Sequence, residues 1–291
     1  MTKTKKTRKK RSPRYEQRIV LFIDFLGFKE IVERTRDDRP FLAHLVKAMD
    51  RVGQIGRDNK EFSKSQRITQ FSDCIVVSYH VNECSAVFWL LNEVAFCVID
   101  LVERGFLLRG ALTVGDLLHT RTHIVGPAMV AAYELESKVA KFPRILIDLG
   151  VLAVARRARS ELHSPDEEAE YVKGFMTKDM DARYYFDYVS WTSVVEVTGG
   201  NDELYPDYLE KVGALIKTGL QHDNPGVAEK YLWLHDQYVK AIDLIATLPA
   251  DNPYRLSNPE NVTLIEGLPK HDALAKKARK LVTARPSHPP T

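Results

Sequence analysis

The stretch IVLFIDFLGFKEIVERT (residues 19–35) decides how this chain folds. Its first six residues form an apolar run that ends in a carboxylate, Asp24, and such a run is typical of a buried strand. Gly27 then precedes FKEIVERT, whose pattern predicts a helix. A carboxylate within an apolar run is costly unless it is paired, hydrogen-bonded or bound to a metal ion. Asp24 is therefore the first candidate functional residue.

A second carboxylate lies in a comparable place. Two runs typical of strands, RITQFS (67–72) and CIVVSYH (74–80), meet at Ser72-Asp73, which puts Asp73 at a hairpin turn. If the first strand lies beside this hairpin, Asp24 and Asp73 reach the same edge of the sheet and can share divalent cations. Mg²⁺ and Mn²⁺ suit such a site because they take oxygen ligands from carboxylates and substrate phosphates. Each residue alone is equally well explained structurally, Asp24 as an N-cap and Asp73 as a turn residue; the pair favours a metal site.

The remaining pattern alternates helices with hairpins. We expect helices over 40–52, 83–104 and 128–141, and strands over 107–114, 117–125 and 144–148. Gly115-Asp116 indicates a hairpin turn between two of these strands, with Asp116 as a turn residue. The element order predicts an α+β fold, with an antiparallel or mixed sheet that has helices on one face and is ferredoxin-like at its centre.

The chain divides into four segments by composition. We expect a basic disordered tail over 1–16, a first domain over 17–150, an α-rich C-terminal extension packed on that core over 151–280, and a flexible tail over 281–291. Residues 1–14 hold eight Lys or Arg and no acid, and without them 34 basic and 39 acidic residues leave a net charge of −5. A solubilising extension explains the tail better than nucleic-acid or membrane binding, because no aromatic residue is interleaved for base stacking.

Composition also bounds the class of protein. The 291 residues are 44% hydrophobic and 28% charged, which is enough for a sizeable core. No apolar run is long enough for a membrane span, and no secretory signal is apparent. Cys74, Cys84 and Cys97 are too few and too irregularly spaced for a disulfide framework or a zinc site, and Cys74 is expected to pack inside as a small hydrophobe. We therefore expect a cytoplasmic protein.

Four motifs in this order resemble the class III nucleotidyl cyclase homology domain. They are FIDFLGF (22–28), FSDCIVV (71–77), RGALTVGD (109–116) and GPAMVAAYELES (126–137). The resemblance covers residues 17–150, about half of the chain, and implies that this segment is a cyclase domain with a ferredoxin-like core.

The resemblance also implies a set of site residues. Asp24 and Asp73 would be catalytic and would bind two Mn²⁺ or Mg²⁺ ions, with the backbone carbonyl of Phe25 as a further ligand. The turn formed by Phe25, Leu26, Gly27 and Phe28 would cradle the triphosphate, and the helix that begins there would aim backbone N–H groups at a phosphate.

The departures from the family pattern concern the nucleobase and the transition state. Thr69 stands where purine cyclases have a base-selecting lysine, and His123 stands at the second base-reading position. Val130 and Glu134 replace the asparagine and the arginine that orient the ribose and stabilise the transition state. His119 and His123 alternate on one expected strand, which favours polar surface residues on one face.

The retained aspartates favour an active enzyme with a different base. The motifs resemble the pyrimidine (uridylate or cytidylate) cyclases of the bacterial anti-phage system called Pycsar. This resemblance implies synthesis of a 3′,5′-cyclic pyrimidine monophosphate that activates a separate effector protein in antiviral defence. We favour UTP over CTP as the substrate, although no residue decides between them. The alternatives are a purine (ATP or GTP) cyclase and an inactive pseudo-cyclase that binds a nucleotide or a partner.

A cation must replace the missing arginine in this interpretation. Arg109, Lys138, Lys141 and Arg144 are candidates, each of which is also well explained as a structural residue. The family works as a head-to-tail homodimer with composite active sites, so base-reading residues would come from the partner subunit. Two-fold dimers are also the commonest oligomers in general.

Overall fold

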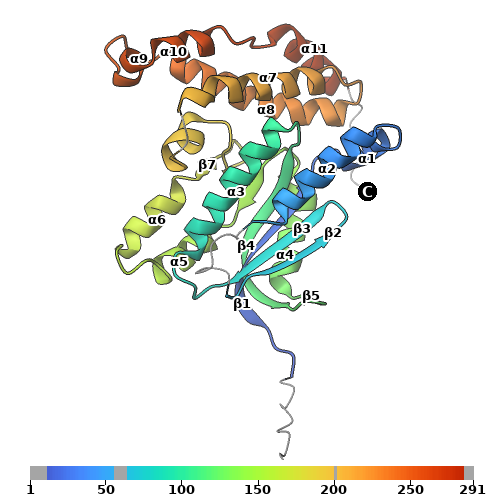
Figure 1. The fold of residues 1–291 in the computed structure, drawn as a ribbon, viewed down its shortest axis with the longest axis vertical. Helices are drawn as coiled ribbons and strands as arrows, with labels where there is room; N and C mark the ends of the chain where they lie inside the picture. Colours follow the sequence, from blue (N-terminus) through green and yellow to red (C-terminus); the bar gives the residue numbers. More distant parts are fainter. Residues whose placement is uncertain (1–11, 56–63, 200–201, 285–291) are drawn as a thin grey trace, which may run out of the picture.

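The computed structural model describes residues 12–55, 64–199 and 202–284 (Figure 1). The expected tails over 1–16 and 281–291 therefore lie largely outside the described residues. The strands are β1 (Glu16–Phe25), β2 (Arg67–Phe71), β3 (Cys74–His80), β4 (Leu108–His119), β5 (Ile124–Val125), β6 (Ile145–Ile147), β7 (Met176–Lys178) and β8 (Tyr184–Phe186).

Helices occupy most of the chain between and after these strands. The α-helices are α1 (Phe28–Thr35), α2 (Arg39–Val52), α3 (Ala86–Glu103), α4 (Pro127–Glu134), α5 (Gly150–Arg157), α6 (Pro165–Lys173), α7 (Tyr205–Leu220), α8 (Pro225–Ala246), α9 (Pro253–Ser257), α10 (Pro259–Glu266) and α11 (Asp272–Thr283). Two π-helices, η1 (Leu135–Ala140) and η2 (Thr192–Val197), and a 3₁₀ turn, η3 (Asp202–Leu204), complete the described elements.

The sheet confirms the predicted α+β class. Its strand order is β2-β3-β1-β4-β6-β8-β7, and β5 pairs with the far end of β4. The first four strands are antiparallel, and their order with the helices between them is that of a ferredoxin-like split βαβ unit. The parallel pairing of β4 with β6 makes the sheet mixed.

Strand β1 runs through the middle of the sheet and is buried on both faces. Successive side chains of a strand point to opposite faces, and here Leu21 and Ile23 join the large core under α2 and α3, whereas Val20 and Phe22 join a second cluster under α4. Helix α4 thus covers the sheet face opposite α2 and α3, whereas the sequence predicts helices on one face. This two-sided burial explains why the run IVLFI does not alternate with polar residues.

Strand β4 is longer than the sequence pattern predicts, and the expected hairpin turn at Gly115-Asp116 is wrong. These residues continue the strand and pair with Arg18 and Gln17 of β1. A side chain at position 115 would approach the Cβ of Ala128 at 3.3 Å, so Gly115 gives α4 room against the strand. The turn falls later, where the N–H of Thr120 donates to the carbonyl of His123 over 2.8 Å.

The C-terminal half completes the sheet and extends the core. Strands β8 and β7 continue the sheet beyond β6, and the buried side chains of α5 to α8 belong to the same cluster as those of β1 and α3. Figure 1 shows α7 to α11 gathered at the end of the molecule where α1 lies, opposite the start of β1. Because β1 runs toward that end, Asp24 lies on the side of the C-terminal helices.

Candidate functional site

Asp24 is the second-to-last residue of β1, and its carboxylate is partly buried. Its side chain is 13% exposed, and it pairs across the sheet with Arg109 of β4. Arg109 donates from Nη2 to Oδ2 of Asp24 over 2.9 Å. Among the described residues, the other oxygen, Oδ1, is buried without a hydrogen-bond partner. A buried carboxylate oxygen without a partner is costly, so this atom needs a ligand or a proton.

Asp73 lies in the two-residue turn between β2 and β3, as the sequence predicts. The turn is tight because Ser72 adopts a left-handed conformation with φ of 54°, while Phe71 pairs directly with Cys74. The hairpin brings Asp73 to Asp24: one ligand atom from each of Asp24, Asp73 and Cys74 lies within 4.8 Å of the others. The expectation that these two carboxylates share one edge of the sheet is met in the geometry.

The surroundings of Asp24 favour the protonated form of its carboxyl group. Burial, with the neighbouring Asp73 adding to it, raises the pKa of Asp24 to about 7, and the nearby Arg109 opposes this shift. Burial and a neighbouring acid both disfavour the ionised form of Asp24, and positive charge beyond that of Arg109 would favour it. A divalent cation would supply that charge and the missing partner of Oδ1.

The donor set fits a hard divalent metal ion. Carboxylate oxygens are the ligands that Mg²⁺ and Mn²⁺ prefer. Burial raises the pKa of the Cys74 thiol to about 12, with Asp24 and Asp73 adding to the shift, so the thiol stays protonated. A protonated thiol is a poor ligand, and Cys74 therefore contributes packing while the two aspartates supply the oxygens.

Glu136 is a member of the cluster that the sequence did not single out. It lies in η1 with 3% of its surface exposed, and its Oε1 is 2.5 Å from Nη2 of Arg109. Burial raises the pKa of Glu136, and Arg109 counteracts this effect. Arg109 is thus shared between Asp24 and Glu136. Glu136 belongs to the motif GPAMVAAYELES, which is the one sequence signal that could have pointed to it.

Lys230 of α8 is the second residue that the sequence analysis missed. It is half-buried, and burial together with Arg109 lowers its pKa, while Asp24, Glu30 and Glu136 act to raise it. Lys230 makes no ion pair within the described residues, although the site acids act on its pKa. Neighbouring contacts fix this part of α8: Lys141 pairs with Glu229. In the sequence, Lys230 is one of the polar positions of a long amphipathic helix, and no motif marks it as a site residue.

The turn expected to cradle the triphosphate connects β1 to α1. Phe25 is buried and ends β1, and the N–H of Leu26 donates to the carbonyl of Leu107 over 2.9 Å. Gly27 has φ of 76°, which L side chains rarely adopt. Helix α1 begins at Phe28, and the first N–H groups of a helix have no partner within it. The turn therefore follows Asp24 directly and places the start of α1 beside the carboxylates.

Thr69 and His123, the expected base-reading residues, do not contact each other. Oγ1 of Thr69 is 2.9 Å from Nε2 of His119, whereas His123 lies in the exposed turn and its Nδ1 is 2.8 Å from Oγ1 of Thr122. His119 is 6% exposed, so the expectation of a polar surface residue is wrong for it. The cause is the position of the turn, which leaves His119 at the end of β4 and separates it from His123.

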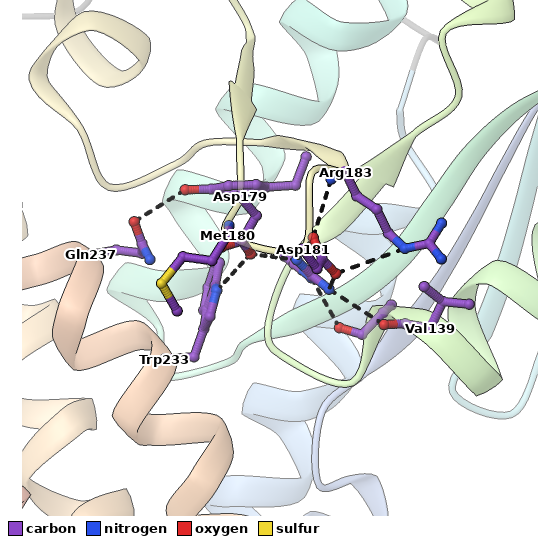
Figure 2. A network of polar contacts seen from close by, with 10 residues as sticks. Val139, Asp179, Met180, Asp181, Arg183, Trp233 and Gln237 are labelled. Carbon is purple, nitrogen blue, oxygen red and sulfur yellow. Dashed lines mark hydrogen bonds and ion pairs between the residues drawn. The ribbon is translucent and has the colours of Figure 1, made fainter.

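The four candidate cations lie in different places. Arg109 contacts Asp24, but Lys138 is exposed and donates to Glu134 over 2.7 Å, and Lys141 pairs with Glu229. Arg144 is 1% exposed and pairs with Asp179 and Asp181, two of the residues labelled in the network of Figure 2. Among the described contacts of these four cations, those of Arg109 are the ones that reach the aspartates.

The network around Arg144 holds the two halves of the chain together. Its guanidinium donates to the carbonyls of Ala140 and Val139 as well as to both aspartates. Trp233 of α8 donates from Nε1 to Asp179 over 2.8 Å, as seen in Figure 2. Arg144 thus ties η1, the β7–β8 loop and α8 into one unit.

Comparisons with known proteins give structural resemblance alone. No family model matches the sequence, and no curated protein sequence matches it. The adenylyl cyclase CyaB from P. aeruginosa has 16% identity and a TM-score of 0.40, with 50% of this chain and 83% of that chain covered. A bacterial light-regulated adenylyl cyclase has 13% identity and a TM-score of 0.40, with 56% of this chain and 58% of that chain covered.

A third solved structure is described as a class III adenylyl cyclase-like ATP-binding protein from Pseudomonas aeruginosa. It has 13% identity and a TM-score of 0.37, with 63% of this chain and 40% of that chain covered. This chain therefore spans about half of the length of two of these three neighbours. All three TM-scores lie below 0.5, and the site is interpreted from its own geometry.

The model also bears on membrane insertion. Within the parts of the chain that the structure describes, no helix combines the length and the apolar character needed to cross a bilayer.

Proposed function

We propose that this protein is a metal-dependent nucleotide cyclase that converts UTP to 3′,5′-cyclic UMP and pyrophosphate. The observation that carries the proposal is the pair Asp24 and Asp73, whose ligand atoms lie within 4.8 Å at the end of a buried strand. The unpartnered Oδ1 of Asp24 supports a missing ligand at this point within the described structure. The four sequence motifs supply the reaction class.

Asp24 and Asp73 would hold two Mg²⁺ or Mn²⁺ ions, with the backbone carbonyl of Phe25 beside them. When bound, the ions would activate the ribose 3′-hydroxyl and neutralise charge on the phosphates. The chain's own contribution is to fix the carboxylates, because Arg109 anchors Asp24 from the neighbouring strand and Glu136 anchors Arg109 in turn.

The reaction forms one bond and breaks another. The 3′-oxygen bonds to the α-phosphorus, the bond from that phosphorus to the bridging oxygen breaks, and pyrophosphate leaves with the bond's electrons. The hydroxyl proton passes to solvent water. Such transfers depend on positioning and on charge stabilisation more than on covalent chemistry. Arg109 and Lys230 are the cations that we propose for the phosphate charge, with Lys230 supplied by the C-terminal extension.

The substrate branch, the biological role and the assembly are parts of the same proposal. The resemblance to pyrimidine cyclases supports UTP as the substrate and a separate effector protein as the receiver of the cyclic product in antiviral defence. A homodimer with composite sites is supported by the outer face of α4, where Val130 and Tyr133 are 58% and 52% exposed. Exposed apolar patches of this kind are typical of interaction surfaces.

The test is a product analysis with the full-length protein. Purified protein is incubated with Mn²⁺ and, separately, with ATP, GTP, CTP or UTP, and the products are separated by chromatography. Cyclic UMP is the expected product. Cyclic AMP or cyclic GMP would indicate a purine cyclase with an unusual base pocket. If none of the four triphosphates is converted, even with the cell's own lysate added as a source of activators, the proposed activity is wrong and a nucleotide-binding pseudo-cyclase remains.

A further inference from the structure

A chain of buried polar side chains runs across the sheet face that also bears Asp24. Arg18 of β1 and Ser78 of β3 are 2% and 0% exposed, and Nε of Arg18 donates to Oγ of Ser78 over 2.9 Å. Oγ of Ser78 is 2.8 Å from Nδ1 of His119, whose Nε2 is 2.9 Å from Oγ1 of Thr69. Thr69 is half-buried at the end of this chain.

The donors and acceptors in this chain follow from its chemistry. Arg18 donates and never accepts, so one lone pair of the Ser78 oxygen is occupied. If His119 also donated to that oxygen, the hydrogen of Ser78 would have no acceptor in the described surroundings, and a buried donor without an acceptor is costly. Ser78 therefore donates to Nδ1 of His119.

Burial determines the charge of His119, and the contact with Ser78 determines its tautomer. Burial, with Arg18 and Arg67 adding to it, lowers the pKa of His119 to about 4, so the ring is neutral at pH 7. A neutral imidazole carries one N–H, and since Nδ1 accepts from Ser78, Nε2 carries the hydrogen. Nε2 then donates to Oγ1 of Thr69. The hydroxyl hydrogen of Thr69 is left pointing away from His119, and it has no acceptor among the described residues.

The position of Thr69 suits contact with a bound base if the phosphates occupy the proposed site. Thr69 lies four residues before Asp73 on the same hairpin, or roughly 13 Å along it at the rise of a strand. It pairs with Val76, which pairs with Phe22, and Phe22 shares its sheet face with Asp24 because strand side chains alternate. A cavity of about 690 Å³ adjoins the Arg18 and His119 part of this chain, and Glu16, Gln66 and Arg67 also line it.

We infer that the hydroxyl of Thr69 is held as a hydrogen-bond donor toward the nucleobase and selects uracil over cytosine. Uracil presents an oxo group, O4, where cytosine presents an amino group, and an oxo group accepts the Thr69 hydrogen whereas an amino group leaves it unpaired. This inference rests on the proposed function and assigns the base that the sequence leaves open.

The test compares UTP and CTP in one assay. The variant Thr69→Val removes the hydroxyl at nearly constant volume, and we expect kcat/KM for UTP to fall about tenfold to a hundredfold while that for CTP changes less than about threefold. Ser78→Ala removes the donor to Nδ1 and frees the other tautomer, so the ratio of UTP to CTP should fall by a smaller factor. Thr218→Val, at an exposed position of α7, is the control and should leave the ratio unchanged.

Binding separates this inference from the proposed function. Titration calorimetry with UTP and with CTP in the presence of Ca²⁺ measures affinity without turnover. If the wild type makes no cyclic product but binds UTP more tightly than CTP, and Thr69→Val abolishes the difference, then the inference holds and the cyclase activity is wrong. Equal losses for both nucleotides in Thr69→Val, an unchanged ratio, or no binding of either nucleotide to the folded wild type would overturn the inference.

Discussion

Two arginines, the partly buried Arg109 of β4 and the buried Arg144 just before β6, differ in how completely their partners satisfy them. Arg144 uses its guanidinium fully, with two aspartates and two backbone carbonyls. Arg109 also meets two acids, but its Nε and Oδ1 of Asp24 have no hydrogen-bond partner in the described structure. Buried polar groups are nearly always satisfied. A complete network indicates a structural role, and an incomplete one indicates a site for a ligand.

The largest expected effect breaks the incomplete cluster. Asp24→Asn and Asp73→Asn keep the shape of each side chain and remove the charge that holds the metal ions. We expect formation of the cyclic product to fall by about a thousandfold or more in each variant, because charge stabilisation supplies most of the rate. A discontinuous product assay with Mn²⁺ and UTP measures this.

Two further observations keep this prediction specific to the site. At pH 7 the melting temperature of each variant should stay close to that of the wild type, since asparagine keeps the shape of the aspartate side chain. Asp166→Asn in α6, an exposed acid, is the matched control. Retention of most of the activity in either site variant would contradict a metal role for that aspartate.

Substitution in the complete network around Arg144 should lower the stability of the protein and change its activity little. Arg144→Met leaves Asp179 buried without its cation, and removing one partner of a buried ion pair costs about 3–5 kcal/mol of the free energy of unfolding. Urea denaturation monitored by circular dichroism measures the loss. Activity per folded molecule at low temperature should change little, because Arg144 has no contact with Asp24 among those described.

An exposed arginine provides the control for this predicted loss of stability. Arg156 pairs with Asp166 at the surface, and Arg156→Met should cost less than about 1 kcal/mol. If Arg144→Met unfolds no more readily than Arg156→Met but loses activity, then Arg144 belongs to the site and the distinction between the two arginines fails.

Lys230 tests whether the C-terminal half contributes to the incomplete cluster. Lys230→Gln removes a half-buried cation whose charge acts on Asp24 and Glu136, and we expect kcat/KM for UTP to fall about tenfold to a hundredfold. Lys240→Gln, at an exposed position of the same helix, should have no effect, and Lys230→Arg should restore part of the activity. Equal rates for the two glutamine variants would remove Lys230 from the proposed site.

The sequence predicts the part of the site that local pattern encodes. An apolar strand ending in Asp24 and a hairpin turning at Asp73 are both visible in short stretches, and the ferredoxin-like order follows from the alternation of elements. The predicted position of the second hairpin turn is wrong because Gly115 lies within β4, where the absence of a side chain allows close packing against Ala128. That error placed His119 on the surface, although tertiary contacts with Ser78 and Thr69 bury it.

Other members of the site depend on contacts between residues far apart in sequence. Glu136 lies in a π-helical segment, and Lys230, which is electrostatically coupled to Asp24, lies on a helix more than two hundred residues after it. A local pattern does not encode either position. The same limit explains why Arg144 was a plausible candidate cation: its partners, Asp179 and Asp181, lie in a loop whose place beside β6 is set by the β7–β8 pairing.

The smallest expected effect concerns the dependence of stability on pH in metal-free protein. The pKa of Asp24 is raised from 3.8 to about 7 in the folded state, so between pH 4 and pH 7 the folded state binds a proton that the unfolded state has lost. Stability attributable to Asp24 therefore falls as the pH rises through this window. Asp24→Asn lacks this titration, so the melting temperature of the wild type should decline relative to that of the variant from pH 4 to pH 7 in EDTA. Added Mn²⁺ should reduce the decline, because a bound cation favours the ionised carboxylates, whereas parallel curves for the two proteins in EDTA would mean that Asp24 ionises normally and that its unpartnered oxygen is not a strained feature of the folded state.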